Sequence, residues 1–276
     1  MKKQLRRLLI PTLLVATLSA CSTSPTGRSQ ILAYSPSQLN KMGAQSFAEM
    51  KQKVPISKDA KVNQFVQCVA DAITVNVSKN TYDGQWEVVV FDSEQINAFA
   101  LPGGKIGVYT GILQVTDDAD QLAAIIGHEV GHVIAQHSNE RLTNSNLQTG
   151  AVILAGALAS EDKRMMTMAA VGLGIQYGFV LPYSRTHESE ADIIGQELMA
   201  TSGFKPEASV QLWHNMAKAS NGAPPEFLST HPSHDTRIKN LTNHLQVSDP
   251  IYAQRSTTPT CKKPVIKPPA KQSKQS

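Results

Sequence analysis

Residues 128–132 read His-Glu-Val-Gly-His, a pattern whose residue types and spacing favour metal chemistry. Two histidines four positions apart lie on one face of a helix, so the imidazoles of His128 and His132 can bind one metal ion. Glu129 lies between them, where its carboxylate can hold and deprotonate a water on that ion. Neutral imidazole suits zinc, and a catalytic zinc site keeps one position open. The pattern predicts a metal-dependent hydrolase, against the alternative of a chance match on a solvated helix.

The segment that carries this pattern is predicted to be a helix. Apolar residues recur at helical spacing through residues 121–137, after an acidic opening at residues 117–120 that suits a helix N-terminus. Gly127 and Gly131 each lower helix propensity by about 1 kcal/mol relative to alanine. We therefore interpret both glycines as positions where another backbone approaches closely.

A third metal ligand is expected because two histidines hold zinc weakly. A helix predicted from just after Pro182 to near Gly203 contains the string Thr-His-Glu-Ser-Glu-Ala-Asp. It offers His187, Glu188 and Glu190 as ligands. Helical periodicity alone does not choose among these three.

His-Glu-x-x-His followed by Glu-x-x-Ala-Asp resembles the gluzincin metallopeptidases typified by HtpX and the CAAX prenyl protease, especially their periplasmic lipoprotein branch. The resemblance covers residues 26–245. It implies that His128 and His132 bind zinc, that Glu129 is the general base, and that Glu188 is the third ligand of one zinc ion per chain.

Three further positions take their roles from this resemblance alone. Asp192, one turn after Glu188, matches a carboxylate that orients a ligating histidine. His231 matches a position near the metal, where it either occupies the open zinc position in a resting state or stabilises the oxyanion during turnover. Arg237 matches an arginine that helps to hold this region. The remaining histidines are interpreted as structural: His137, His187, His214, His234 and His244.

The residues between the two ends predict one α+β domain over residues 37–247, mostly helical and of the zincin-like metalloprotease type. Helices are expected over residues 37–51 and 58–77, and a strand over residues 86–91. Residues 97–109 predict two short strands about a Pro-Gly-Gly turn, directly before the metal-binding helix. We expect no helical-repeat domain after residue 245.

The first strand of that hairpin has a candidate use in substrate binding. Its edge can pair with an extended peptide and lay the scissile bond across the zinc. The alternative is a hairpin that only completes the sheet. The edge residues are Asn97, Ala98, Phe99 and Ala100.

Residues 149–181 contain two apolar stretches separated by a polar turn at residues 160–164. A single membrane crossing here would separate His132 from the downstream ligand. We therefore expect an apolar helical hairpin outside the membrane, packed over the catalytic domain or resting against a membrane or a partner.

The N-terminus predicts a lipoprotein signal peptide over residues 1–20. Four basic residues precede an apolar run over residues 8–20, and Leu-Ser-Ala-Cys has the form of a lipoprotein cleavage site, with Cys21 as the lipidated residue. The alternative is a transmembrane anchor, but about 13 apolar residues that include Pro11 are too few to span a bilayer comfortably. Residues 21–36 would form a tether. Because Ser22 rather than Asp follows the cysteine, the expected location is the periplasmic, inner leaflet of the outer membrane.

Charge and composition exclude a nucleic-acid partner. The formal net charge of +4 equals the four basic residues of the signal peptide, and no basic face remains in the rest of the chain. Residues 248–276 are rich in lysine and proline and predict a disordered tail. Cys68 and Cys261 can form a disulfide in an oxidising compartment, the alternative being two free thiols.

Taken together, the motifs predict a zinc-dependent endopeptidase of the cell envelope, and the family resemblance implies that it acts on misfolded or misassembled envelope proteins. The expected partners are polypeptide substrates, the membrane through the N-terminal lipid, and the outer-membrane assembly machinery. The alternative function is a client-binding assembly factor for outer-membrane proteins in which proteolysis is rare or latent.

Overall fold

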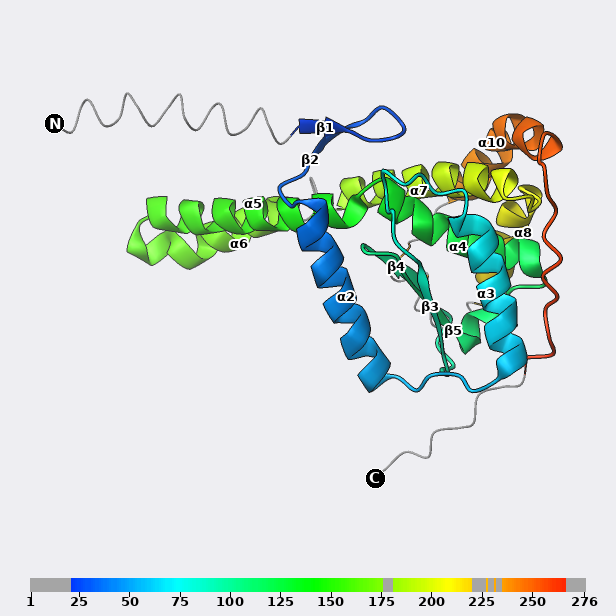
Figure 1. The fold of residues 1–276 in the computed structure, drawn as a ribbon. Coiled ribbons are helices and arrows are strands. Elements are labelled where there is room, and N and C mark those ends of the chain that lie inside the picture. The colour runs from blue at the N-terminus through cyan, green and yellow to red at the C-terminus, as the bar shows by residue number, and fades with distance from the viewer. Residues whose placement is uncertain (1–20, 176–180, 220–226, 228–230, 232–234, 267–276) are drawn as a thin grey trace. The chain divides into compact units, whose positions relative to one another are not determined.

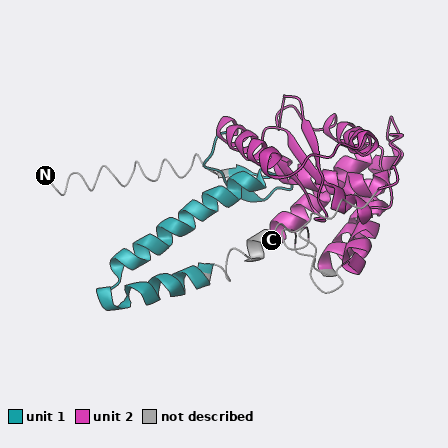
Figure 2. Cartoon of the chain, turned by 90° about the horizontal axis from the view of Figure 1, so that it is seen from below, with its two compact units in different colours: residues 1–35, 135–184 teal, residues 36–134, 185–276 magenta. Residues whose placement is uncertain are grey.

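The computed structural model describes residues 21–175, 181–219, 227, 231 and 235–266. The chain divides into two compact units (Figure 2): unit 1 contains residues 1–35 and 135–184, and unit 2 contains residues 36–134 and 185–276. The elements are mostly helices with two small sheets, which confirms the predicted α+β class (Figure 1). The predicted signal peptide and residues 267–276 of the predicted tail lie outside the described residues.

Unit 2 contains a three-stranded sheet of β3 (Glu87–Phe91), β4 (Ala98–Leu101) and β5 (Lys105–Tyr109). The order is β3-β5-β4, with β5 parallel to β3 and antiparallel to β4. The turn between β4 and β5 contains Gly103 and Gly104, whose positive φ angles of 84° and 66° favour glycine. The predicted hairpin is therefore confirmed, and β4 is an edge strand of the described sheet.

Alternate residues of the three strands point to opposite faces of this sheet, as strand geometry requires. One face contributes Val90, Ala100 and Val108 to a core shared with α3 (Ala60–Thr74) and α4 (Ala119–Ile134). The other face places Phe91 and Tyr109 against α2 (Pro36–Lys53), where Phe47 packs at 6.2 Å from the Phe91 ring. The sheet thus lies between α2 on one side and α3 and α4 on the other (Figure 1). A short 3-10 helix, η1 (Thr110–Gln114), leads from β5 towards α4.

The rest of unit 2 is helical and includes α7 (Leu181–Thr201), whose first turn belongs to unit 1, α8 (Glu207–Ala219) and α10 (Asp235–Ala253). Helices α4 and α7 approach closely at small residues. A Cβ added to Gly127 would lie 2.8 Å from the carbonyl oxygen of Gly195, and one added to Gly131 would lie 2.9 Å from that of Ala191. This confirms the interpretation of Gly127 and Gly131, and it identifies α7 as the approaching backbone.

Unit 1 contains a two-stranded sheet of β1 (Cys21–Thr23) and β2 (Ser29–Ile31), followed in sequence by α5 (His137–Leu158), η2 (Glu161–Lys163) and α6 (Arg164–Ile175). The prediction of a tether over residues 21–36 is wrong, because polar contacts hold this segment to α5. Arg28 donates two hydrogen bonds, of 2.8 and 2.7 Å, to the buried carboxylate of Glu140. Gln30 donates to the carbonyl of Ala135 at 2.7 Å.

The predicted apolar hairpin is present as α5 and α6, which pack against each other. Helix α5 begins at His137, twelve residues before the predicted apolar stretch, and residues 176–180 of the prediction lie outside the described residues. Within the described part of the chain, we find no helix with the length and apolar character needed to cross a membrane.

The C-terminal segment differs from the predicted disordered tail. Helix α10 continues through Pro250 to Ala253, beyond the predicted domain end at residue 247. Cys261 forms a disulfide with Cys68 of α3, and the Lys263 ammonium group donates to the carbonyl of Thr116. These links hold residues 254–266 against unit 2, although their composition offers little apolar surface to bury.

Candidate metal centre

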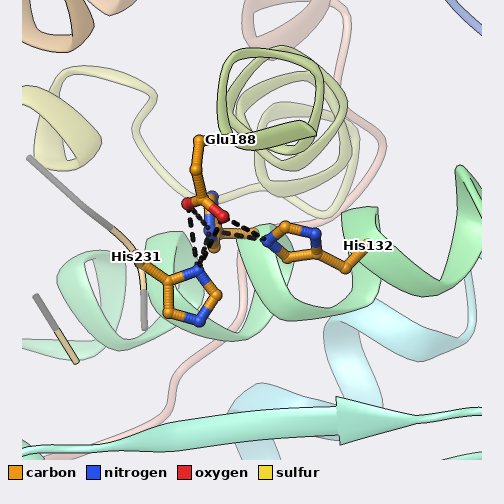
Figure 3. Close-up of side chains that lie close together, drawn as sticks. His132, Glu188 and His231 are labelled. Carbon is orange, nitrogen blue, oxygen red and sulfur yellow. Dashed lines mark hydrogen bonds and ion pairs between the residues drawn. The ribbon is translucent and has the colours of Figure 1, made fainter. Parts of the chain in front are cut away.

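Four side chains converge in unit 2 from three separate segments. His128 and His132 come from α4, Glu188 comes from α7, and His231 lies between α8 and α10 in the sequence. Figure 3 shows His132, Glu188 and His231 pointing towards one another. All four residues are buried, and one potential ligand atom from each lies within 4.8 Å of the other three.

The donor atoms are spaced as a tetrahedral metal site requires. The Nε2 atoms of His128 and His132 are 3.1 Å apart, and they lie 3.3 and 3.4 Å from the two carboxylate oxygens of Glu188. The Nδ1 atom of His231 is 3.2 Å from His128 Nε2. Ligands at about 2.0 to 2.1 Å from a tetrahedral ion are separated by about 3.3 Å. Three imidazoles and one carboxylate at these distances fit a divalent metal such as zinc.

A buried carboxylate and guanidinium hold this group in place. Asp192, one turn after Glu188 on α7, accepts a hydrogen bond of 2.9 Å from Nδ1 of His128, which leaves Nε2 of that ring facing the other donors. Arg237 donates to both oxygens of Asp192, at 2.7 and 2.5 Å, and to Glu188 at 3.1 Å. Asp192 thus contacts a ring of the donor group, and Arg237 links the carboxylates of Asp192 and Glu188.

Burial and charge pairing shift the ionisation of these groups in different directions. Burial alone would lower the pKa of His128, but hydrogen bonds to Asp192 and Glu188 raise that pKa to about 9. Burial dominates at His132 and lowers its pKa well below 6.5. Burial opposes ionisation of Glu188 and Asp192, yet the imidazoles around Glu188 and the Arg237 charge beside Asp192 lower both carboxyl pKa values. Both carboxylates are therefore ionised at neutral pH, as a cation site requires.

Glu129 is buried beside the donor group without being part of it. Its Oε1 atom accepts no hydrogen bond from a described residue and lies 3.3 Å from Nε2 of His231. A buried carboxylate oxygen without a hydrogen-bond donor has a strong tendency to bind one. It is suited to accept a proton from a water at the centre.

The predicted substrate edge lies in the same unit. Ala98, Phe99 and Ala100 belong to β4, and Asn97 immediately precedes it. The carbonyl of Ile96 accepts a hydrogen bond of 3.0 Å from the amide of Phe227, four residues before His231. The start of the edge strand is therefore linked to the segment that carries His231.

The other histidines that the structure describes do not join the donor group. His187 is buried next to Glu188, His214 is exposed on α8, and His244 lies 2.8 Å from Glu197. His137 is buried in unit 1, and His234 lies outside the described residues.

Two aromatic residues that the sequence analysis did not single out support the site. The guanidinium of Arg237 lies 3.8 Å from the centre of the Trp213 ring, and the ring of Phe227 stacks on that of His231 with centroids 4.6 Å apart. Trp213 lies on α8, whose amphipathic sequence could have been recognised as a helix. Nothing in its spacing indicates a contact with Arg237.

Residues 57–245 match the profile of Peptidase family M48. The chain belongs to this family. The segment matched includes all four donors of the centre and Glu129, Asp192 and Arg237.

Known M48-related proteins from mitochondria and bacteria align with this chain. It is 37% identical over 161 residues to the mitochondrial metalloendopeptidase OMA1 of Schizosaccharomyces pombe, an alignment that covers 58% of this chain and 46% of the relative. Identity to the Bos taurus OMA1 metalloendopeptidase is 32% over 240 residues, covering 78% and 44%. Identity to the beta-barrel assembly-enhancing protease of Escherichia coli K12 is 24% over 276 residues, covering 93% and 56%. This M48 chain thus spans about half the length of these relatives.

Proposed function

We propose that this chain is a zinc-dependent endopeptidase that hydrolyses peptide bonds. The observation that carries the proposal is the convergence of His128, His132 and Glu188 on one buried point, with the carboxylate of Glu129 beside it. Zinc bound there would polarise the scissile carbonyl and lower the pKa of a water towards about 7. Glu129 would take the proton from the attacking water and return it to the leaving amine.

The edge of β4 would position the substrate. An extended peptide that adds to this edge forms main-chain hydrogen bonds independent of its sequence, with Asn97, Ala98, Phe99 and Ala100 as the contact residues. Such binding suits an enzyme whose substrates are exposed segments of misfolded proteins, because those share an extended backbone rather than a sequence.

His231 would have two successive roles. With its Nδ1 atom among the donors, it completes a four-ligand set that would hold the centre in a resting form. Moved away from the metal, it would free a position for substrate and could donate a hydrogen bond to the developing oxyanion. The 3.3 Å approach of its Nε2 to Glu129 supports a place beside the reacting groups.

A glutamine at position 129 tests the catalytic proposal. Glu129→Gln should retain about one zinc per chain and a native circular dichroism spectrum, while casein or peptide cleavage falls by about 100-fold to 10,000-fold, the usual contribution of a general base. His128→Ala should lose both metal and activity. Unchanged turnover in Glu129→Gln would refute the role of this carboxylate.

For location and substrate, we propose a lipid-anchored protease of the periplasmic branch of the family, attached through Cys21 to the inner leaflet of the outer membrane. Its substrates would be misassembled envelope proteins, and the outer-membrane assembly machinery would be a partner. Similarity to a relative named as a beta-barrel assembly-enhancing protease supports this proposal. Metabolic labelling with palmitate should mark the parent but not Cys21→Ser. New termini of barrel proteins in outer-membrane fractions should require active enzyme.

A second candidate function uses the same strand edge without cleavage. A client-binding assembly factor would hold an extended segment on β4 and release it intact. Capture of barrel proteins by Glu129→Gln, combined with no cleavage by the parent, would favour this function.

A further inference from the structure

The hairpin of α5 and α6 exposes many large apolar side chains. Of the thirteen large apolar side chains that are exposed in the described residues, seven lie on these two helices. Leu158 is 79% exposed and Met165 is 78% exposed, so these are whole side chains in contact with solvent. The seven residues, which we call the hairpin face, are Leu147, Ile153, Leu154, Leu158, Met165, Met166 and Leu173. A cluster of this kind marks an interaction surface, whereas single exposed apolar residues do not.

The arrangement along α6 shows that the surface is a property of the whole helix. Residues 165, 166, 169, 170 and 173 are all exposed, and this spacing places them on one face. The partly buried residues of the opposite face, such as Met168, face α5, where Gly156 allows close contact with the Met168 sulfur. Helix α6 is therefore apolar on both faces, a property of helices surrounded by protein or by lipid.

The composition of the hairpin face favours lipid over a specific protein partner. Helices α5 and α6 contain no phenylalanine, tyrosine or tryptophan, the side chains that most often anchor protein interfaces. No charged residue occurs between Arg141 and Glu161, or between Arg164 and Arg185. The charged residues of this region lie at the exposed turn around η2, where two acidic residues at 161–162 are followed by two basic residues at 163–164.

The hairpin also shares a compact unit with the proposed point of lipid attachment. Cys21 begins β1, and its partner strand β2 is held to α5 by the two hydrogen bonds from Arg28 to Glu140 and by Gln30. A lipid on Cys21 would keep unit 1 at a bilayer surface. This connection commits the face to one occupant, the membrane that carries the anchor.

We infer that the hairpin of α5 and α6 lies in the interface of the lipid monolayer to which the N-terminus is attached, with the hairpin face among the acyl chains. The inference deepens the proposed location and rests on it for the identity of the membrane. Helix α6 has 12 residues and is about 18 Å long, against a hydrocarbon core of about 30 Å. Shallow insertion parallel to the surface, rather than a crossing, is the arrangement that fits, with the charged turn at the level of the headgroups.

Vesicle binding by an unlipidated protein tests the inference. The test protein is the mature chain from residue 21 with Cys21→Ser and Glu129→Gln, so that neither a lipid nor proteolysis contributes. It should co-sediment with vesicles of phosphatidylethanolamine and phosphatidylglycerol, also at about 0.5 M salt, where interactions between exposed charges are screened. Leu158→Gln with Met165→Gln should lower the partition coefficient by roughly tenfold or more.

A matched control is available in unit 2. Val75 and Val265 are 78% and 90% exposed, and Val75→Gln with Val265→Gln should leave vesicle binding unchanged. A separate measurement gives the depth of the hairpin face in the bilayer. A tryptophan in Leu154→Trp should be quenched by lipids brominated on their acyl chains, and one in Val75→Trp should not.

Three results would overturn the inference. The first is absence of vesicle binding by the test protein, and the second is equal binding by the two double variants. The third is concentration-dependent self-association that Leu158→Gln with Met165→Gln abolishes, without vesicle binding, which would assign the face to a second copy of the chain. None of these measurements depends on metal binding or on cleavage, so a failure here is distinguishable from a failure of the protease proposal.

Discussion

Replacing Gly195 by alanine should lower the activity of this protein strongly while changing its unfolding free energy only slightly. Gly195 lies on α7, and a Cβ at this position would be 2.6 Å from the backbone nitrogen of His128 and 2.8 Å from its Cα atom. The nearest atom is therefore about 0.8 Å closer than the 3.4 Å at which ordinary van der Waals contact begins. Because the neighbours are backbone atoms of α4, the strain is relieved only if the two helices separate.

The expected effects on stability nearly cancel. Alanine favours a helix by about 1 kcal/mol relative to glycine, while overpacking costs about 1 to 3 kcal/mol. The net loss of unfolding free energy should therefore stay below about 2 kcal/mol. The site is more sensitive, because α7 carries Glu188 and Asp192 while α4 carries their histidine partners. A displacement approaching 1 Å can lower activity by about 100-fold, and metal sites tolerate only about 0.2 Å.

The assay combines urea unfolding, zinc competition with a chromogenic chelator, and kcat/KM on a fluorogenic peptide. Gly195→Ala should bind zinc more weakly and cleave about 100-fold more slowly, with a small change in unfolding midpoint. Gly150→Ala is the control, because Gly150 is also helical and a Cβ there has no atom within 4 Å. It should be slightly more stable and fully active. Parental zinc affinity and turnover in Gly195→Ala would refute the argument that this contact sets the spacing of the ligands.

Three further predictions concern the fold. Cys261→Ser removes a link between residues 193 positions apart and should lower the unfolding free energy by up to about 5 kcal/mol, so an unchanged urea midpoint would contradict a stabilising role for the disulfide. Glu87 accepts hydrogen bonds from Lys51 and Lys105, which lower its pKa from 4.5; the stabilisation is present above pH 4.5 and is lost as the pH falls through the lower, folded pKa. Between about pH 5 and pH 3 the parent should therefore lose more stability than Glu87→Gln, and parallel stability curves would contradict this. Removing metal with a chelator should lower the melting temperature, and zinc at about 100 times its Kd should restore about 2.7 kcal/mol; calorimetry that shows no dependence on zinc would exclude metal as a structural element.

The sequence predicted the relative positions of residues that are close together in the chain. His128 and His132 are one helical turn apart, so their common direction follows from helix geometry alone. Gly127 and Gly131 indicated a close approach because each lowers the propensity of a predicted helix, and the structure shows Gly195 and Ala191 opposite them. The Pro-Gly-Gly turn likewise predicted the hairpin of β4 and β5.

Relationships between distant segments could not be derived from spacing. Periodicity left Glu188 undistinguished from His187 and Glu190, and only the family resemblance chose Glu188 as a ligand. The parallel pairing of β3 with β5 depends on packing rather than on a local signal. Residues 21–36 were predicted to be a tether, because the two bonds from Arg28 to Glu140 join positions 112 apart in the chain and leave no local signal.

The division of the chain into units has a consequence for how such a protease can vary. Residues 135–184 belong to unit 1, and the chain returns to unit 2 at Arg185, three positions before Glu188. A whole segment of another unit therefore separates His132 from Glu188 in the sequence. The entropy of closing a loop grows only with the logarithm of its length, so this insertion can be lengthened, shortened or exchanged at little thermodynamic penalty to the centre. On the proposed membrane attachment of unit 1, the residues for attachment and those for catalysis would lie in separate segments of the chain. A change of target membrane would then require no change in the catalytic residues.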